Sequence, residues 1–209
     1  MNKDKEFFDG CAANWDKIRD TDSHKLQKLV NMIKLQQGDN VLDVGTGTGV
    51  LLPYLLQAIC ANGHITAVDF SEKMLEQAKL KQQHKKNIIF EAGDIMELEL
   101  SKESFNAITC LNFYPHLHNR KEEFLKKMLP LLKKGGTLTI FHDISREQVN
   151  SIHAESKEVR EHKLPPADEV GLLLQNASYV LVQVYEDDTM YFVCLLYTSP
   201  SPRDISGSR

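Results

Sequence analysis

The stretch VLDVGTGTGV, residues Val41–Val50, decides how this chain folds. Val41, Leu42 and Val44 form an apolar run typical of a short strand buried on both faces, and the LLPYLLQAI that follows has the length and leucine spacing of a helix. The three glycines therefore lie in a turn between a strand and a helix. Because glycine carries no side chain, backbone amides and the N-terminus of the helix can approach a ligand there directly.

The spacing of these glycines distinguishes two kinds of nucleotide-binding turn. A dinucleotide site requires Gly-x-Gly-x-x-Gly, so that a pyrophosphate rests on the helix N-terminus. Here Gly45, Gly47 and Gly49 are evenly spaced, and Val50 stands where the third dinucleotide glycine would be. This spacing, with Asp43 before it, resembles the first motif of class I S-adenosylmethionine (SAM) methyltransferases. A glycine-rich turn that binds no ligand is the alternative interpretation.

Length and composition limit the function further. A chain of 209 residues is long enough for one domain, and its 42% apolar and 26% charged residues are ordinary for a globular protein. The formal net charge of -4 provides no basic excess for binding nucleic acid. The sequence shows no apolar run of signal-peptide or membrane-span length, so a cytoplasmic location is expected. The four cysteines are scattered, which argues against a disulfide framework or a four-cysteine zinc site.

The C-terminal segment CLLYTSPSPRDISGSR, residues 194–209, leaves an apolar strand for a string of Ser, Pro, Gly and Arg without periodicity. Its first eleven residues can be back-translated into DNA that resembles a transposon-end sequencing adapter read through in frame. We therefore predict a native domain at residues 1–193 and a non-native tail at residues 194–209. A disordered native C-terminus is the alternative.

Helical and strand patterns alternate through residues 1–193, which predicts an α/β fold with a mostly parallel sheet and helices on both faces. The last two strands are joined by a short turn, so they must be antiparallel. Asn119 with Glu122, and Ser145 with Gln148, have the spacing of helix capping boxes. The predicted helices span residues 4–20, 22–35, 49–60, 71–83, 119–132, 145–161 and 167–176, and the predicted strands span residues 40–44, 64–70, 87–93, 105–112, 136–143, 179–185 and 189–193.

Polar residues at the ends of the predicted strands are candidates for ligand contacts, since ligands bind beyond the carboxyl ends of parallel strands. Asp69 ends the second strand, just before the predicted helix N-cap Ser71, where its carboxylate can accept both hydroxyls of a ribose. Asp43, before the glycine-rich turn, can orient an ammonium group. Asp94 follows the third strand. The alternatives are a helix-capping or solvent-facing acid at Asp69 and a plain loop aspartate at Asp94.

The ordered set VLDVGTGTG, VDFSEKML, GD and KKGGTLTI resembles the class I SAM-dependent methyltransferases over essentially residues 1–193. The opening FFDGCAANWD is similar to that of relatives of the ubiquinone and menaquinone biosynthesis methyltransferases. The resemblance implies a Rossmann-like sheet of seven strands with the last strand antiparallel, SAM as cofactor, and Asp94 facing the adenine amino group. The SAM contacts that it implies are Asp43, Gly45, Thr46, Gly47, Gly49, Asp69, Phe70, Asp94, Ile95 and Leu111.

Methyl transfer is an in-line displacement, so the protein mainly positions a nucleophile and excludes water. If the acceptor is a phenol or a carbon acid, a histidine base helps. His116 and His118 follow the fourth strand and His142 lies at the end of the fifth, on the ligand side of the sheet. Solvated loop histidines are the alternative. A metal site formed by these three histidines is a further alternative, but we predict no metal because methyl transfer does not need one.

A polar stripe follows the fifth strand. Arg146, Asn150 and His153 share one helix face at spacings of four and three residues. This face is predicted to cover the acceptor, and His116, His142 and Arg146 are the predicted catalytic residues. A charged surface helix is the alternative for the stripe, and core packing is the alternative for the N-terminal aromatic residues. The residues predicted to line the acceptor pocket are Phe7, Phe8, Trp15, Phe113 and Tyr114.

The chain is therefore predicted to transfer a methyl group from SAM to a small-molecule acceptor, for which a quinone-like ring is one candidate. No nucleic acid or membrane partner is expected, and the sequence does not indicate an oligomeric state. The segment LNFYPHLHNR after the fourth strand carries neither the Asn-Pro-Pro-Tyr signature of amide and amine methylation nor a clear match to the quinone enzymes. The alternative functions are an NAD(P)-dependent oxidoreductase, which the glycine spacing and the final hairpin disfavour, and a catalytically silent SAM-binding regulatory protein.

Overall fold

The computed structural model describes residues 2–19, 21–155, 157, 159–174 and 179–198. Within them, one sheet has the strand order β3-β2-β1-β4-β5-β7-β6. Strands β1 to β5 pair with one another in parallel, and β7 runs antiparallel to both β5 and β6. The predicted seven-stranded, Rossmann-like α/β fold with its last strand antiparallel is confirmed. The strands are β1 (Asn40–Val44), β2 (His64–Asp69), β3 (Ile88–Ala92), β4 (Phe105–Leu111), β5 (Leu132–His142), β6 (Tyr179–Glu186) and β7 (Tyr191–Tyr197).

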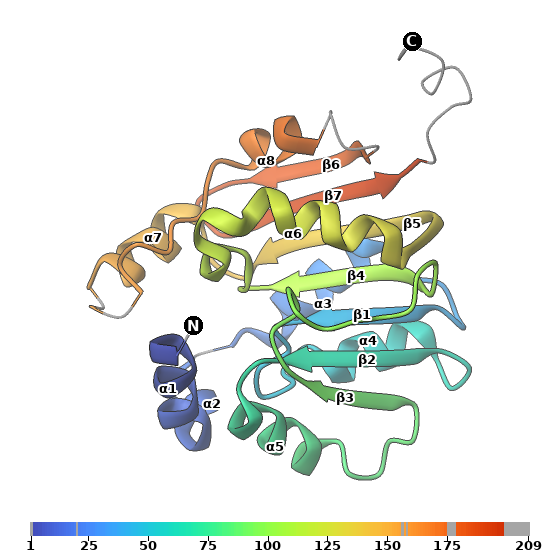
Figure 1. Ribbon diagram of the computed structural model, residues 1–209, viewed down its shortest axis with the longest axis horizontal. Coiled ribbons are helices and arrows are strands. Elements are labelled where there is room, and N and C mark those ends of the chain that lie inside the picture. The colour runs from blue at the N-terminus through green and yellow to red at the C-terminus, as the bar shows by residue number, and fades with distance from the viewer. Residues whose placement is uncertain (1, 20, 156, 158, 175–178, 199–209) are drawn as a thin grey trace.

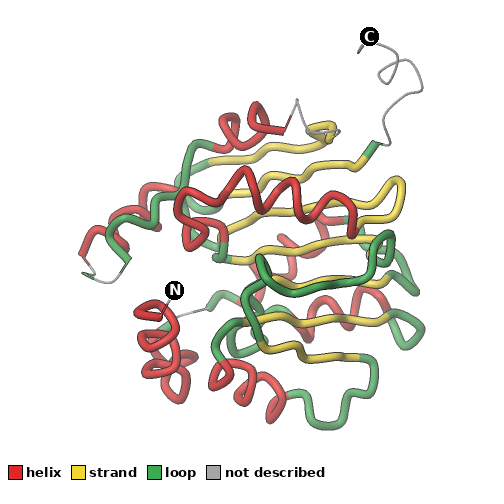
Figure 2. The backbone as a smooth tube through the Cα atoms, viewed as in Figure 1, coloured by secondary structure: helices red, strands yellow, loops and turns green. Residues whose placement is uncertain are grey.

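Helices cover both faces of this sheet (Figure 2). One apolar cluster contains Phe124 and Val170 from α6 and α8, and the other contains Leu29 and Leu55 from α3 and α4. The described helical elements, with 3-10 helices labelled η, are α1 (Asn2–Cys11), η1 (Ala12–Asn14), α2 (Trp15–Ile18), α3 (Ser23–Ile33), α4 (Leu52–Ile59), α5 (Glu72–Lys81), η2 (Tyr114–Arg120), α6 (Lys121–Met128), η3 (Leu129–Leu131), α7 (Arg146–Glu155) and α8 (Ala167–Leu174).

The strand order reverses direction at β1, because β2 and β3 lie on one side of it and β4 and β5 on the other. In open α/β sheets, ligands bind at this switch point, beyond the carboxyl ends of the strands. Figure 1 shows the arrowheads of the parallel strands at one edge of the sheet, with α1, α2 and α7 beyond that edge. A ligand site is therefore expected where these helices face the carboxyl ends of the strands.

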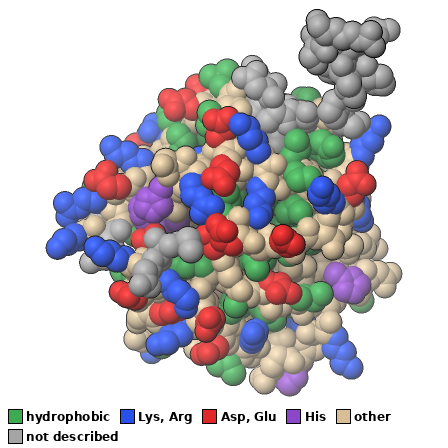
Figure 3. All heavy atoms as spheres, in the orientation of Figure 1, with side chains coloured by type: hydrophobic (Ala, Val, Ile, Leu, Met, Phe, Trp, Pro, Cys, Tyr) green, Lys and Arg blue, Asp and Glu red, His purple; other side chains and the backbone are tan. Residues whose placement is uncertain are grey.

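The surface carries charges of both signs. Figure 3 shows Lys and Arg side chains interspersed with Asp and Glu over the face seen there, in keeping with the small net charge of -4. Among the described residues, no helix is both long enough and apolar enough to span a membrane.

The N-terminal helix predicted at residues 4–20 is broken. It ends at Cys11, the chain turns through η1, and a second short helix begins at Trp15. This turn brings the rings of Phe8 and Trp15 together, with their centroids 5.5 Å apart. Packing between these two aromatic side chains therefore overrides the continuous helical pattern of the sequence.

The helix predicted at residues 49–60 begins later, at Leu52. Gly45, Gly47 and Gly49 have φ angles of 70°, 55° and 77°, which a right-handed helix does not accommodate. The helix therefore begins only after the last of the three glycines.

The two predicted capping boxes have different outcomes. Ser145 and Gln148 form theirs: the Gln148 amide donates to Ser145 Oγ over 3.2 Å, and the Ser145 amide donates to Gln148 Oε1 over 3.1 Å. The box predicted at Asn119 and Glu122 is wrong. The residue that precedes α6 makes no side-chain cap, and Glu122 instead accepts from Lys126 Nζ over 2.7 Å.

The last strand crosses the predicted domain limit. β7 continues through Cys194 to Tyr197, still paired with β5 and β6, whereas the predicted strand ends at residue 193. Residues 199–209 lie outside the described residues, so the non-native origin of residues 194–209 stays a prediction. The predicted end of the α8 helix, at residue 176, also lies outside the described residues.

Replacing Gly49 with Ala is expected to destabilise the fold. A Cβ at this position would lie 2.9 Å from Leu52 Cδ1 and 3.0 Å from Ala78 Cβ, and the φ angle of 77° disfavours any side chain. We expect the free energy of unfolding, measured by urea denaturation, to fall by about 1–3 kcal/mol. Gly10→Ala is the matched control, because nothing lies within 4 Å of its Cβ position. Equal stabilities for the two variants would contradict this account of the turn.

Candidate functional site

A cavity of about 440 Å³ opens at the carboxyl edge of the sheet. Its walls come from α1 and α2, the glycine-rich turn, the ends of β2, β4 and β5, and α7. Aromatic and aliphatic side chains form most of these walls, and a few acids and histidines provide polar groups. This composition is typical of a small-molecule site. The predicted site residues that line it are Asp43, Gly45, Thr46, Asp69, Phe70, Leu111, His116 and His142.

The glycine-rich turn is held against the end of β2 by backbone hydrogen bonds. The amides of Gly45 and Thr46 both donate to the carbonyl of Val68, over 2.9 and 3.0 Å. A Cβ at Gly45 would lie 2.5 Å from the ring of Phe113. Glycine is therefore required at this position for packing as well as for its positive φ.

Asp69 lies at the end of β2 and links the turn to α5. Its Oδ2 accepts from the Gly47 amide over 2.8 Å, and its Oδ1 accepts from the Ser71 amide over 2.9 Å. Ser71 is the N-cap of α5, as predicted. Burial raises the pKa of Asp69 to about 6, although the two amides favour the charged form. Each carboxylate oxygen has a second acceptor position, so Asp69 is able to accept hydroxyl groups of a ligand as well.

Asp43 in β1 has one unsatisfied oxygen. Its Oδ1 accepts from the Thr109 hydroxyl over 2.7 Å, whereas its Oδ2 has no hydrogen-bond partner among the described residues. Thr46 Oγ1, in the same cavity wall, lies near the Asp43 carboxylate, although no hydrogen bond of good geometry joins the two. Burial raises the pKa of Asp43 to about 6, and the Thr46 hydroxyl offsets part of that rise. A buried acceptor without a donor is costly, and a ligand with an ammonium group would supply the donor, so these residues fit the amino-acid end of SAM.

Four predicted cofactor contacts lie outside the cavity lining. Asp94 accepts from an amide within its own loop and pairs with Arg120, whose Nη1 lies 3.3 Å from Asp94 Oδ2. Ile95 is buried in the core on one face of the sheet. Gly47 and Gly49 shape the turn without lining the cavity. The structure therefore does not bring Asp94 and Ile95 to the cavity, and their contacts with SAM stay predictions.

His142 is the last residue of β5, and its side chain lines the cavity. Neither ring nitrogen has a hydrogen-bond partner among the described residues. Burial, together with the positive charge of Arg19, lowers the pKa of His142 to about 3. The ring is therefore neutral near pH 7 and able to hydrogen-bond to a ligand.

Sequence reasoning missed Arg19 and Asn112, which both line the cavity. Arg19 Nη2 and Asn112 Nδ2 donate to the same oxygen of Asp143, over 2.8 and 2.9 Å. Asn112 directly follows the buried strand β4, and this position is a signal that could have identified it. No local pattern brings Arg19 to Asp143, because the two are 124 positions apart.

Four more histidines cluster beside the cavity, namely His116, His118, His153 and His162, and His116 and His153 line it. The Nδ1 atoms of His116 and His162 are 2.8 Å apart, so one ring donates to the other. His153 Nδ1 contacts the carbonyl oxygen of His162, and because a carbonyl only accepts, this nitrogen carries a proton. Burial lowers the pKa of both His116 and His153, which favours neutral rings.

The polar stripe of α7 is only partly at the cavity. Arg146 lies outside the cavity lining, and its guanidinium pairs with Glu186. Asn150 binds the segment after α7, because its side chain donates to the Leu164 carbonyl and accepts from the Leu164 amide. His153 is the member of the stripe that lines the cavity. The structure therefore does not bring Arg146 to the predicted acceptor position, since a carboxylate holds it elsewhere.

The N-terminal helices form one wall of the cavity and are tied to the rest of the site. The ring of Phe8 packs edge-on against Phe70, with centroids 5.7 Å apart. The Thr48 hydroxyl of the glycine-rich turn donates to Asp16 over 2.6 Å. Four of the five residues predicted to line the acceptor pocket do line the cavity: Phe7, Phe8, Trp15 and Phe113. The fifth, Tyr114, is buried in the core instead.

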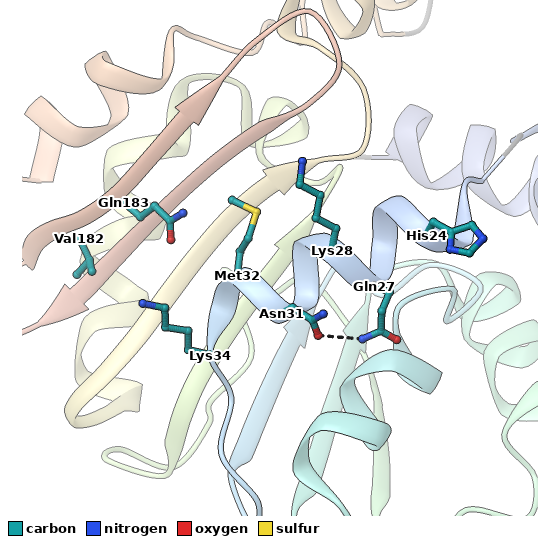
Figure 4. A pocket seen from close by; sticks show the side chains of 8 residues that line it. All are labelled: His24, Gln27, Lys28, Asn31, Met32, Lys34, Val182 and Gln183. Atoms are coloured by element: carbon teal, nitrogen blue, oxygen red, sulfur yellow. Dashed lines mark hydrogen bonds between the residues drawn. The ribbon is translucent and has the colours of Figure 1, made fainter.

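Another hollow lies between α3 and the edge strand β6 (Figure 4). Its polar side chains are exposed or half-buried, and Gln27 Nε2 donates to Asn31 Oδ1 over 3.0 Å. Among its described lining residues, none has a buried polar atom without a partner. We therefore assign the functional site to the cavity at the carboxyl edge.

Replacing Asp43 with Asn is expected to change how stability depends on pH. The pKa of Asp43 is raised in the folded chain, so the unfolded state releases its proton at a lower pH than the folded state does. As pH rises from about 4 to about 6, Asp43 therefore reduces the free energy of unfolding, by about 3 kcal/mol for a shift of about two pKa units. Asn does not titrate, so the stability of the variant relative to the native chain should rise over that range and then level off.

Urea denaturation at a series of pH values measures this difference. Asp22→Asn is the contrast, because the amides of Lys25 and His24 lower the pKa of Asp22, so its effect is confined to pH values below about 4. If the difference between Asp43→Asn and the native chain is constant from about pH 4 to about pH 7, Asp43 is not a buried charge of this kind.

Comparison with known proteins agrees with this site. Residues 41–136 match a family model described as a methyltransferase domain. The chain is 25% identical over 195 residues to a malonyl-[acyl-carrier protein] O-methyltransferase of Bacillus cereus, covering 91% of this chain and 67% of that protein. It is 31% identical over 140 residues to a demethylmenaquinone methyltransferase of Listeria welshimeri, covering 63% of this chain and 58% of that protein. The aligned part of the chain thus spans about three fifths to two thirds of these relatives.

Solved structures share the fold. A SAM-dependent methyltransferase from Aquifex aeolicus superposes with a TM-score of 0.72 at 24% identity, covering 90% of this chain and 98% of that one. A Haemonchus contortus N-methyltransferase, solved with S-adenosylhomocysteine, superposes with a TM-score of 0.71 at 13% identity, covering 85% of this chain and 53% of that one. The family match begins at the first apolar residue of the glycine-rich stretch and extends through β4 into β5, so this part of the chain is similar to the methyltransferase domains.

Proposed function

We propose that this chain transfers a methyl group from SAM to a small, largely apolar acceptor molecule. One observation carries the proposal: a single cavity joins the glycine-rich turn and its two buried acids to a wall of aromatic and aliphatic side chains. A cofactor and an acceptor bound in this cavity would lie next to each other. Such proximity is the main requirement of an in-line displacement.

The turn and the two acids are proposed to hold SAM. Asp43 Oδ2 and Thr46 Oγ1 are the unsatisfied atoms that an ammonium group would contact. Asp69 would accept the ribose hydroxyls at its free acceptor positions, with Phe70 beside it in the cavity wall. SAM supplies a methyl group made electrophilic by its positively charged sulfur. Leu111, on the opposite wall, is an apolar contact.

The acceptor end of the cavity favours an uncharged molecule. Its apolar walls exclude water from the reaction. Within the described lining, Arg19 is the one Lys or Arg side chain, and Asp143 already neutralises it. A carboxylate acceptor would therefore find no free cation in these walls. This argument supports a ring such as a quinone, which the name of the Listeria relative suggests, over an acidic acceptor.

Histidines are proposed to handle the proton that an oxygen or carbon acceptor loses on methylation. His142 is neutral and its two ring nitrogens have no partner among the described residues, so it is able to accept that proton. His116 also lines the cavity, but its Nδ1 is engaged with His162. A low pKa makes His142 a weak base, so it would accept the proton as the acceptor oxygen bonds to the methyl group, when the positive charge developing on that oxygen makes its proton strongly acidic.

Replacing Asp69 with Ala is expected to weaken SAM binding by roughly 30- to 1000-fold, because it removes charge-assisted hydrogen bonds worth about 2–4 kcal/mol. Isothermal titration calorimetry with SAM measures the affinity. Asp188→Ala, which removes an exposed carboxylate from the turn between β6 and β7, is the control and should bind SAM as the native chain does. Native affinity in Asp69→Ala would refute the proposed cofactor site.

Replacing His142 with Gln is expected to lower turnover by about 100-fold or more while SAM affinity is retained, because Gln keeps hydrogen bonding but loses basicity. The acceptor is first identified by incubating the native chain with methyl-tritiated SAM and a metabolite extract. Turnover of that acceptor at the native rate would rule out His142 as the base. If SAM binds but no metabolite is labelled, the chain is a SAM-binding protein without this activity.

A further inference from the structure

Beside the cavity, three potential metal ligands from distant parts of the sequence face one another. They are Asp4 of α1, His118 of η2 and His162 of the segment after α7, and their ligand atoms all lie within 4.8 Å of each other. His118 Nε2 is 3.2 Å from Asp4 Oδ2, and His162 Nε2 is 3.9 Å from Asp4 Oδ1. In tetrahedral Zn²⁺ sites with bonds of about 2.0–2.2 Å, ligand atoms lie about 3.3–3.6 Å apart. The observed spacing needs only small side-chain shifts to match.

His162 is held in the way that metal-ligating histidines usually are. Its side chain is buried, and its Nδ1 lies 2.8 Å from His116 Nδ1. When His116 is the acceptor in this hydrogen bond, Nδ1 of His162 carries the proton and Nε2, which faces Asp4, has a free lone pair. A hydrogen bond from the other ring nitrogen is the standard device for orienting a metal-bound histidine. His153 Nδ1 also donates to the carbonyl of His162 and fixes its backbone.

The backbone at His118 also has a feature that is typical of ligand-binding positions. His118 has φ 52° and ψ -121°, a conformation that is unfavourable for any residue with a side chain. Such strain persists only where the surroundings impose it, and it concentrates at ligand-binding positions. Lys121 Nζ donates to the carbonyl of His118 over 2.7 Å and stabilises this turn. The His118 side chain is 43% exposed, so an ion can reach the group from solvent.

We propose that Asp4, His118 and His162 bind one divalent transition-metal ion of the Zn²⁺ class. Two imidazole nitrogens and one carboxylate suit such an ion, whereas Mg²⁺ and Ca²⁺ prefer all-oxygen ligands. Three protein ligands leave a further position for water. The sequence predicts no metal, and its all-histidine alternative of His116, His118 and His142 shares only His118 with this site.

The ion would act as a clasp, by which we mean that it would hold three separate parts of the cavity wall together. Asp4 belongs to the helix that carries Phe7 and Phe8, which line the cavity, while the other two ligands belong to η2 and to the segment after α7. A bound ion therefore ties the N-terminal helix to two other parts of the cavity wall. The methyl transfer itself needs no metal, so this site is independent of the proposed function.

Titration of the full chain with Zn²⁺ alone, by calorimetry, tests the site. We expect one Zn²⁺ per chain, with the affinity reduced at least about tenfold in both Asp4→Asn and His118→Gln. Matched controls are Glu6→Gln, an exposed acid on the same helix, and His84→Gln, an exposed histidine outside the cluster. Cys60→Ser removes the exposed thiol and should also bind Zn²⁺ as the native chain does. Circular dichroism confirms that each variant is folded.

A second readout tests the clasp without any activity assay. Trp15 is the single tryptophan of the chain and packs against Phe8, so its fluorescence should change with Zn²⁺ and saturate at one equivalent. This change should be absent in Asp4→Asn. The metal site is overturned if the native chain binds no Zn²⁺, or if either ligand variant binds it with native affinity. Binding of Zn²⁺ that leaves the Trp15 emission unchanged overturns the clasp.

Discussion

The carboxylate of Asp69 is the interaction on which the rest of the site depends. Its two oxygens accept from the amides of Gly47 and Ser71, so one side chain joins the glycine-rich turn to the start of α5. A buried charge is costly in a low-dielectric interior, and the two amides and the positive end of a helix offset part of that cost. The raised pKa of Asp69 shows that the compensation is incomplete. A ligand with hydroxyl groups would complete it, which explains why this acid lies at a cavity.

Asp43 adds a second buried acid to the cavity and so affects the charge of the whole cavity. Each of the two acids has a pKa near 6 and each is buried, and their like charges raise the cost of ionising Asp43 further. Arg19 does not relieve them, because its guanidinium pairs with Asp143. The cavity therefore carries an uncompensated negative charge beside the turn and neutral walls elsewhere. A cationic cofactor and an uncharged acceptor are the pair of molecules that suits this distribution.

Local pattern predicted most of the sheet and the turn, because strand periodicity, glycine spacing and an acid at a strand end are properties of neighbouring residues. The pairing of Ser145 with Gln148 was predictable for the same reason. The ion pair of Arg146 was not predictable in this way. Its place on a helix face was predicted correctly, but its partner Glu186 lies 40 positions away in β6. The approach of Asp4 to His162 likewise depends on how the N-terminal helix docks. Docking is set by aromatic packing across the fold, which no local spacing encodes.

The histidine cluster links the proposed metal site to the proposed chemistry through hydrogen positions. A metal ion on His162 Nε2 requires the proton of that ring to be on Nδ1, where it is donated to His116 Nδ1. His116 then accepts at Nδ1, and a neutral imidazole that accepts at Nδ1 carries its own proton on Nε2. A ring in this state donates to a ligand and cannot remove a proton from it. Occupancy of the metal site would therefore make His116 a donor in the cavity wall and leave His142, whose ring nitrogens have no described partner, as the base.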